Sequence, residues 1–248
     1  MNTPKPASTS VDPSEVAHFR ALAETWWQAD GPFWPLHLLN TTRISYLSVK
    51  VKAVGASDQQ PFAGLRVLDV GCGGGLLAEA MVRLGAQVTA IDVVERNIDI
   101  AKLHANENSL LIDYRLSSVE QLLADGCEPF DLLLNMEVVE HVADLDSYMA
   151  ACCAMVSPGG QQVVATINRN PWAWFTAVFM AERVLRLLPV GTHHWRKLRR
   201  PDEISAQLCA HGFDLTAQTG VAVNPFKRRM KLTPSLAINY MLVAQKQS

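Results

Sequence analysis

The stretch Val67-Leu68-Asp69-Val70-Gly71-Cys72-Gly73-Gly74-Gly75 decides the fold of this 248-residue chain. Residues 67–70 form a short, mostly apolar and β-branched run, which is typical of a buried parallel strand, and residues 76–84 continue with a helical pattern. The glycines between them allow the backbone to turn sharply and to approach a ligand without an intervening Cβ. The stretch therefore predicts a strand, a glycine-rich turn and a helix that form a cofactor site, and not a generic loop.

The spacing of the glycines distinguishes two kinds of cofactor. The dinucleotide pattern G-x-G-x-x-G needs a third glycine at position 76, where this sequence has Leu76. The actual pattern is G-x-G-x-G over residues 71–75, and Asp69 lies two residues ahead of the first glycine. This spacing favours S-adenosylmethionine and disfavours an NAD-dependent dehydrogenase. We therefore predict Asp69, Gly71 and Gly73 as contacts of S-adenosylmethionine.

A second anchor for the cofactor lies downstream. Residues 87–92 (Gln-Val-Thr-Ala-Ile-Asp) have a strand pattern that ends in the carboxylate of Asp92. An acid at the end of the second strand of a nucleotide-binding α/β fold accepts hydrogen bonds from both ribose hydroxyls. Since NAD and S-adenosylmethionine both contain a ribose, Asp92 predicts the ribose site and the glycine spacing selects the cofactor.

The length and composition predict one domain with an N-terminal extension. A chain of 248 residues with 49% hydrophobic residues is large enough to bury a full core. We expect residues 1–60 to hold a flexible tail and N-terminal helices that cover the active site. Residues 61–248 are expected to form the cofactor-binding domain, with a membrane-facing insertion at about 169–200.

Two helices are predicted in the N-terminal region, over residues 15–27 and 36–54, and Gly31-Pro32 separates them. The aromatic pairs Trp26-Trp27 and Phe33-Trp34 lie around this break. Aromatic residues at helical spacing suit core packing, and they also suit an aromatic lid over the site. Both interpretations remain open at this point.

The charge is unevenly distributed along the chain. The formal net charge is −2, which argues against a dedicated nucleic-acid binder. Residues 166–231, however, contain 11 Lys and Arg against 4 Asp and Glu, so the remaining chain has 11 against 20. Such asymmetry indicates an interaction surface for an anionic membrane or a polyanion, and the alternative is a solvated face.

The cysteines and the N-terminus predict a cytoplasmic protein. The five cysteines form no C-x-x-C pair, which is typical of reduced thiols inside the cell. The N-terminal residues include no apolar stretch of the signal-peptide kind, and no run of about 18 apolar residues suggests a membrane-spanning helix.

The remaining sequence alternates between strand and helix patterns. Strands are predicted at 112–116, 130–135 and 162–167, helices at 95–107 and 145–155, and a turn at 157–160. Two further strand patterns, at 213–223 and 239–246, suit an antiparallel hairpin at the edge of the sheet. Alternation over five repeats predicts an α/β fold with a doubly wound, mostly parallel sheet.

Residues 135–142 (Asn-Met-Glu-Val-Val-Glu-His-Val) follow the fourth predicted strand. Ligands of doubly wound sheets bind outside the carboxyl ends of the strands, so we expect this turn to face the reacting centre. Enzymes that methylate the exocyclic amine of a base typically carry an Asn/Asp-Pro-Pro-aromatic turn here, and this turn has no proline. A nucleic-acid methyltransferase is therefore disfavoured despite the basic residues at 227–231, and no nucleic-acid partner is expected.

The sequence resembles the class I S-adenosylmethionine-dependent methyltransferases over most of its length, and more closely the ubiquinone biosynthesis O-methyltransferases. The motifs that carry the second resemblance are Trp26-Trp27, Pro35-Leu36-His37 with Asn40 and Arg43, residues 67–75, 101–105, 136–142, 168–170, 189–193 and 239–242. The sequence departs from the family at His193-His194, because members of the family carry an acid after the first histidine.

The resemblance implies a Rossmann-like sheet of seven strands whose last pair forms the hairpin. It implies that four residues contact the cofactor: Arg43, Gly71, Asp92 and Met136. It further implies methylation of polyprenylated ubiquinone precursors, 2-polyprenyl-6-hydroxyphenol and 3-demethylubiquinol, with other enzymes of ubiquinone biosynthesis as partners. Two alternatives remain open, namely an O-methyltransferase for another small phenolic substrate and a module that binds S-adenosylmethionine without catalysis.

Methylation of a phenol requires removal of its proton, because a phenol of pKa about 10 is mostly protonated at neutral pH. Glu140 and His141 are the nearest candidates for a catalytic base. Glu137 lies three residues before Glu140 and shares its face if the turn is helical. These two carboxylates and the histidine also suit a divalent cation such as Mg²⁺, which lowers the pKa of a bound phenol as a Lewis acid. A purely structural role is the third alternative.

Residues 172–188 predict a helix that lies on a membrane surface. Asn170-Pro171 is a typical helix start, and apolar residues of the segment share one side of a helical projection. The segment is too short and too charged to span a bilayer. Four basic residues follow it: Arg196, Lys197, Arg199 and Arg200. We therefore expect peripheral association with the anionic inner face of the membrane, and the alternative is a helix that caps the pocket or packs in a dimer.

Overall fold

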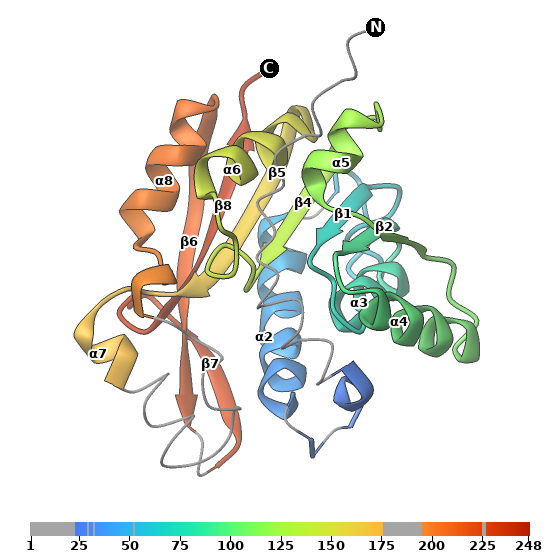
Figure 1. Cartoon of the computed structure of the whole chain (residues 1–248), viewed down its shortest axis with the longest axis horizontal. Coiled ribbons are helices and arrows are strands. Elements are labelled where there is room, and N and C mark those ends of the chain that lie inside the picture. The colour runs from blue at the N-terminus through green and yellow to red at the C-terminus, as the bar shows by residue number, and fades with distance from the viewer. Residues whose placement is uncertain (1–22, 29, 32, 52, 176–194, 225–226) are drawn as a thin grey trace, which may run out of the picture.

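The computed structural model of the chain describes residues 23–248, apart from residues 29, 32, 52, 176–194 and 225–226. Its strands are β1 (Arg66–Val70), β2 (Gln87–Asp92), β3 (Asp113–Leu116), β4 (Phe130–Met136), β5 (Val156–Ile167), β6 (Phe213–Asn224), β7 (Arg229–Thr233) and β8 (Asn239–Lys246). They form one eight-stranded sheet in the order β3-β2-β1-β4-β5-β8-β6-β7 (Figure 1). The first five strands are mutually parallel, and β8 is antiparallel to β5 and β6. The predicted fold class is therefore confirmed.

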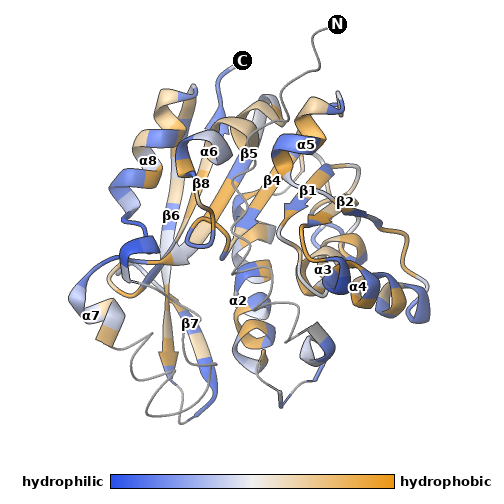
Figure 2. Ribbon diagram, viewed as in Figure 1, coloured by the Kyte–Doolittle hydropathy of each residue, from blue (hydrophilic) through white to orange (hydrophobic). Residues whose placement is uncertain are grey.

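The helices of the described residues pack against the sheet from both sides. Their bounds are η1 (Ala23–Thr25), α2 (Trp34–Lys50), α3 (Leu76–Arg83), α4 (Glu95–Glu107), α5 (Val119–Ala124), α6 (Leu145–Ala154), α7 (Pro171–Ala173), η3 (Trp195–Lys197) and α8 (Pro201–Ala210). One core cluster joins Val67 of β1 to α2, α3 and α4, and a second joins Leu68 of β1 to α5, α6 and α8. Since both faces are covered, the inner strands are rich in apolar residues, and β4 is hydrophobic over most of its length (Figure 2).

The C-terminal hairpin was predicted correctly, but one strand was missed. Strands β6 and β8 pair in antiparallel register, with Phe213 opposite Lys246. An eighth strand, β7, pairs with the far end of β6, where Gly220 lies opposite Thr233. The implied number of seven strands is therefore one too low. The sequence of β7, Arg-Met-Lys-Leu-Thr, resembles a polar loop because an edge strand exposes most of its side chains to solvent.

Two other predicted boundaries differ from the structure. Residues 157–160, expected as a turn before the fifth strand, lie within β5, and the register with β4 shifts between Phe130 and Leu132. The extra residues form a bulge there. Helix α2 covers residues 34–50 and not 36–54, because Pro35 occupies the first turn, where its missing N–H is tolerated. Most of the predicted helix at 15–27 lies outside the described residues.

Candidate active site

The glycine turn between β1 and α3 has the backbone geometry that the sequence predicted. Gly71, Gly73 and Gly75 have φ angles of 68°, 54° and 86°, in the left-handed region that disfavours residues with a Cβ. A Cβ on Gly73 would overlap the indole of Trp26, and one on Gly75 would overlap the hydroxyl of Tyr114. Both the backbone conformation and the packing of neighbouring side chains therefore require glycine at these positions.

Asp92 connects the end of β2 to this turn. Its Oδ2 accepts a hydrogen bond from the Gly73 N–H at 2.9 Å, and its Oδ1 accepts one from the Val94 N–H at 2.8 Å. Burial raises the pKa of the Asp92 carboxyl, while these hydrogen bonds and one from the Asn97 side chain oppose the increase. The structure thus places the predicted ribose acid directly against the predicted cofactor turn, and a carboxylate retains further lone pairs for hydroxyl donors.

Asp69 is a buried carboxyl group close to the same turn. It is 2% exposed, and its Oδ2 has no hydrogen-bond partner among the residues that the structure describes. Burial raises its pKa to about 7, the charge of Asp92 adds to the increase, and the charge of Arg43 opposes it. A buried oxygen without a partner is unfavourable unless a donor reaches it. Asp69 is therefore suited to receive a donor group from a bound ligand.

Arg43 and Glu137, which come from distant parts of the sequence, form an ion pair. Arg43 lies on α2 and is 7% exposed, and Glu137 follows the last residue of β4. Glu137 has a φ of 58°, an unusual value for a residue with a side chain, and its N–H donates to the Ala165 carbonyl at 2.8 Å. Non-glycine residues in this conformation occur preferentially at functional sites. The pair thus joins a predicted cofactor contact to a predicted metal ligand.

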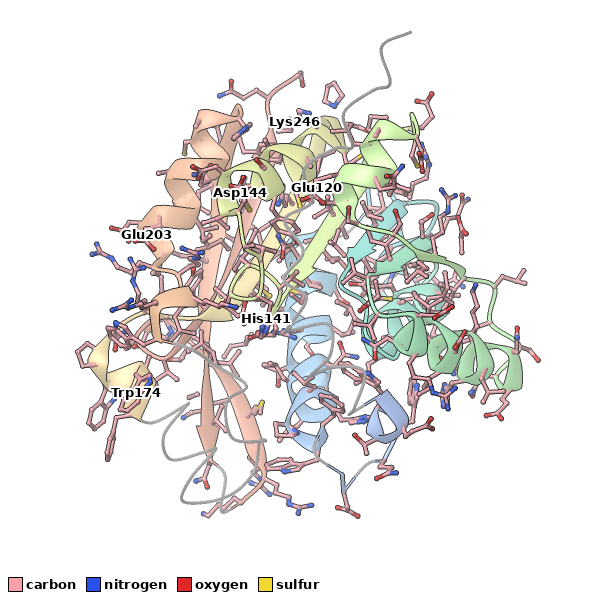
Figure 3. All side chains as sticks on the ribbon, viewed as in Figure 1. Glu120, His141, Asp144, Trp174, Glu203 and Lys246 are labelled. Carbon is pink, nitrogen blue, oxygen red and sulfur yellow. The ribbon has the colours of Figure 1, made fainter. Side chains whose placement is uncertain are left out.

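The segment after β4 is a series of turns and not a helix. The His141 N–H donates to the Val138 carbonyl at 2.8 Å, and Figure 3 shows His141 near the lower end of β4. Met136 and Glu140 are 8% and 2% exposed, whereas His141 is half-buried. In the part of the chain that the structure describes, no three His, Cys, Asp or Glu side chains form a group that could hold a metal ion. Glu137, Glu140 and His141 are therefore neighbours in sequence without forming a metal-ligand cluster in this conformation.

Contacts that the sequence analysis missed connect the N-terminal region to the glycine turn. The Trp27 Nε1–H donates to the Gly74 carbonyl at 2.8 Å, and the Asn40 side chain donates to the Leu76 carbonyl at 3.0 Å. The Trp26 Nε1–H donates to Asn97, the residue that also supports Asp92. The two tryptophans are therefore part of the wall of the site. The family motifs contained Trp26, Trp27 and Asn40 but gave no indication of these contacts.

The site and the fold agree with the comparisons to known proteins. The family model for a methyltransferase domain matches residues 68–164, which include the glycine turn and the turn after β4. The ubiquinone biosynthesis O-methyltransferase of Mesorhizobium japonicum is 48% identical over 248 residues, which cover 99% of each chain. The enzyme of the same name from Roseobacter denitrificans is 47% identical and covers 96% of this chain and 97% of its own.

The chain belongs to the ubiquinone biosynthesis O-methyltransferase family. This membership confirms the predicted family and enzyme class, an S-adenosylmethionine-dependent O-methyltransferase. The membership does not agree with an NAD-dependent dehydrogenase, which the glycine spacing already disfavoured. It also does not agree with a module that binds S-adenosylmethionine without catalysis.

Solved structures support the same fold at low sequence identity. Magnesium protoporphyrin IX methyltransferase from Synechocystis PCC 6803 with bound SAH superposes with a TM-score of 0.65 at 14% identity, over 94% of this chain and all of that chain. A possible histamine N-methyltransferase from Thermotoga maritima gives a TM-score of 0.64 at 11% identity, also over 94% of this chain and all of that chain.

No helix among the described residues of this family member is long and apolar enough to cross a membrane.

Proposed function

We propose that the enzyme transfers the methyl group of S-adenosylmethionine to phenolic hydroxyls of polyprenylated ubiquinone precursors, namely 2-polyprenyl-6-hydroxyphenol and 3-demethylubiquinol. The observation that carries the proposal is the 48% identity to a ubiquinone biosynthesis O-methyltransferase over 99% of both chains. The buried acids and glycine turn at the carboxyl ends of β1 and β2 support it, because this edge of the sheet is where doubly wound folds bind ligands.

The described residues fit S-adenosylmethionine, which supplies an electrophilic methyl group on a sulfonium. Asp92 would accept the ribose hydroxyls, while Gly71 and Gly73 form the turn beside it. Asp69 has a buried oxygen without a partner among the described residues, and this oxygen suits the ammonium group of the methionine part. Arg43 suits its carboxylate, and Met136 at the end of β4 would be a further cofactor contact.

We assign removal of the phenolic proton to His141. Its side chain is half-buried and so remains partly accessible, whereas Glu140 is 2% exposed. A neutral imidazole has a ring nitrogen that can accept a proton, which is the requirement for a general base. His141 would take up the phenolic proton as the phenol oxygen bonds to the methyl group, and the cofactor would supply that methyl group by releasing it from sulfur. Glu140 would support the histidine from its buried position.

A second candidate for activating the phenol is Mg²⁺ held by Glu137, Glu140 and His141. The Arg43–Glu137 ion pair requires Glu137 to release its arginine before it can bind a cation. Carboxylate oxygens are the ligands that Mg²⁺ prefers, so this exchange is chemically reasonable once the cofactor carboxylate occupies Arg43. Full turnover after removal of divalent ions by a chelator would exclude the cation, whereas loss of turnover with recovery on added magnesium would support it.

We further propose that the region around residues 169–200 docks on the anionic inner face of the membrane, where a polyprenylated substrate resides. Most of the predicted amphipathic helix lies outside the described residues, but both flanks support the proposal. The exposed aromatic residues there are Trp172, Trp174, Phe175 and Trp195, at 62%, 38%, 46% and 39% exposed. Figure 3 shows Trp174 on the outer edge of the molecule. Aromatic side chains next to basic residues are typical of a membrane interface.

The experiment that tests the proposed reaction combines purified enzyme, S-adenosylmethionine with an isotopically labelled methyl group, and a short-chain prenylated catechol. A non-prenylated catechol is the matched substrate control. Transfer of label only to the prenylated compound supports the proposal. Equal or faster methylation of the non-prenylated catechol would favour the alternative of a small phenolic substrate.

A further inference from the structure

We infer that Trp27 and His104 are positioning residues for the cofactor turn, because they close a ring of contacts around two consecutive carbonyl groups of its backbone. The ring links residues of the N-terminal region, the glycine turn, α3 and α4. The short helix η1, which ends two residues before Trp27, contacts α4, the green helix beside α3 in Figure 1. The inference rests on the proposed use of this turn for S-adenosylmethionine.

The first half of the ring lies between the N-terminal region and α4. The Trp27 Nε1–H donates a hydrogen bond to the Gly74 carbonyl at 2.8 Å. The indole of Trp27 stacks on the imidazole of His104, with ring centroids 3.4 Å apart and an angle of 8° between the planes. Trp27 can therefore hold the Gly74 carbonyl only in the orientation that the stacking on His104 allows.

The second half of the ring returns to the turn through α3. Nδ1 of His104 lies 2.6 Å from Oε1 of Glu79, whose side chain is 3% exposed. The Glu79 N–H in turn donates to the Gly75 carbonyl at 3.0 Å. Since Gly74 and Gly75 are adjacent, the contacts form a closed circuit that fixes both carbonyls of the turn.

A glycine-rich turn needs such external constraint more than other loops do. Four of the five residues at positions 71–75 are glycines, and glycine loses more conformational freedom on ordering than any other residue. Contacts that order the turn before the cofactor arrives reduce the entropy loss on binding. Trp27 and His104 should therefore affect cofactor affinity and not the methyl-transfer step.

The test compares Trp27→Phe and His104→Asn with wild type. Trp27→Phe retains an aromatic ring that can stack on His104 and removes the N–H donor together with part of the indole. We expect calorimetry to show a dissociation constant for S-adenosylmethionine raised about three- to tenfold, as for loss of one neutral hydrogen bond. KM for the cofactor should rise with it, while kcat and KM for the phenol stay unchanged. The dissociation constant of the double variant should be close to that of the single variant that binds the cofactor more weakly. The two effects do not add, because both substitutions break the same circuit.

The control variants alter the same residue types elsewhere. Trp172→Phe changes an exposed tryptophan on α7, and His211→Asn changes a histidine whose Nδ1 lies 2.8 Å from the Gln207 carbonyl of α8. Both should bind the cofactor like wild type. Hydrogen exchange of residues 71–79 without cofactor gives a readout independent of binding, and it should accelerate in Trp27→Phe and not in the controls.

Three outcomes would overturn the inference. Wild-type affinity and wild-type hydrogen exchange in Trp27→Phe would show that the ring does not order the turn. A fall in the kcat of Trp27→Phe by the same factor as its fall in cofactor affinity would show that the residue has a general structural role. A wild-type protein that does not bind S-adenosylmethionine would overturn the proposed function together with the inference, whereas the first two outcomes leave the proposed function intact.

Discussion

Arg43 on α2 and Glu137, the residue after β4, form an ion pair between the N-terminal region and the central strand. Arg43 is 7% exposed, so removal of its counter-charge leaves a buried guanidinium poorly compensated. In the proposed complex, the carboxylate of the cofactor takes over part of this role. In that complex, the pair would couple cofactor binding to the conformation of the turn that carries Glu140 and His141.

Glu137→Gln tests this coupling. Because the variant removes the charge and retains the shape, we expect the free energy of unfolding to fall by about 1–3 kcal/mol without cofactor. Saturating S-adenosylmethionine should raise the melting temperature of the variant more than that of wild type, since the cofactor carboxylate restores a counter-charge. Equal increases in melting temperature would contradict a contact between Arg43 and the cofactor carboxylate.

Asp69→Asn tests the buried carboxyl group. Burial raises the Asp69 pKa to about 7 in the folded state, above the value of about 4 in an unfolded chain. The stability that this group contributes is therefore complete below about pH 4 and is lost as the pH rises through about 7. At pH 8 the variant should be more stable than wild type by on the order of 1–3 kcal/mol, with little difference at pH 4.

Urea unfolding at both pH values measures this difference without cofactor. A gain of equal size at pH 4 and pH 8 would show that Asp69 does not titrate as described. Binding of S-adenosylmethionine should weaken in the same variant, because an amide lacks the charge that receives the ammonium group.

Gly73→Ala tests the geometry of the glycine turn. Gly73 has a φ of 54°, and a Cβ there would overlap the Trp26 indole. Gly126→Ala is the matched control, because Gly126 has a φ of 72° and a Cβ there would have no neighbouring atom within 4 Å. The control should lose about 1–2 kcal/mol of stability from backbone strain alone and keep its cofactor affinity. Gly73→Ala should lose more stability than the control, and it should no longer bind the cofactor. If calorimetry shows that it binds the cofactor as the control does, the geometric argument is refuted.

His141→Asn tests the assignment of the base. We expect kcat to fall by about two to four orders of magnitude, the range for loss of a general base, while the dissociation constant for S-adenosylmethionine stays within about twofold. Single-turnover kinetics with the prenylated catechol measure the first quantity. A variant with wild-type kcat would assign proton removal elsewhere and leave His141 with a structural role.

Charge reversal tests the membrane proposal. The double substitution Arg196→Glu and Lys197→Glu should reduce sedimentation with anionic liposomes about tenfold or more, since each basic residue near an anionic surface contributes about 1 kcal/mol. The control double substitution, Lys50→Glu and Lys102→Glu, reverses two exposed lysines on α2 and α4. Equal sedimentation of both variants, or none for wild type, would refute docking through this region.

Local patterns are sufficient to predict the centre of the sheet. Strand β1 is buried from Val67 to Val70 and therefore appears as a mostly apolar run, and the left-handed φ angles of the turn require the glycines that follow it. Helix α4 begins and ends where the apolar spacing indicates, at residues 95 and 107. Strand β7 was missed because it is a short, largely exposed edge strand in which only Met230 and Leu232 are apolar.

The contacts that assemble the site were not predictable in this way. The Trp27–Gly74 hydrogen bond joins residues 47 positions apart, and the Arg43–Glu137 pair joins residues 94 apart. Neither leaves a periodic signal, because each depends on how α2 and the N-terminal region pack against the turn. The strained φ of Glu137 is likewise set by tertiary contacts and not by local preference.

The most direct test of the central claim is mass spectrometry of a lipid extract that contains ubiquinone precursors, after incubation with the purified enzyme and methyl-labelled S-adenosylmethionine. The account predicts label on a ring oxygen of polyprenylated phenols, at both O-methylation steps, and no label in a parallel reaction with His141→Asn. Label on a non-prenylated phenol alone, or on no lipid while the enzyme binds the cofactor, would contradict it.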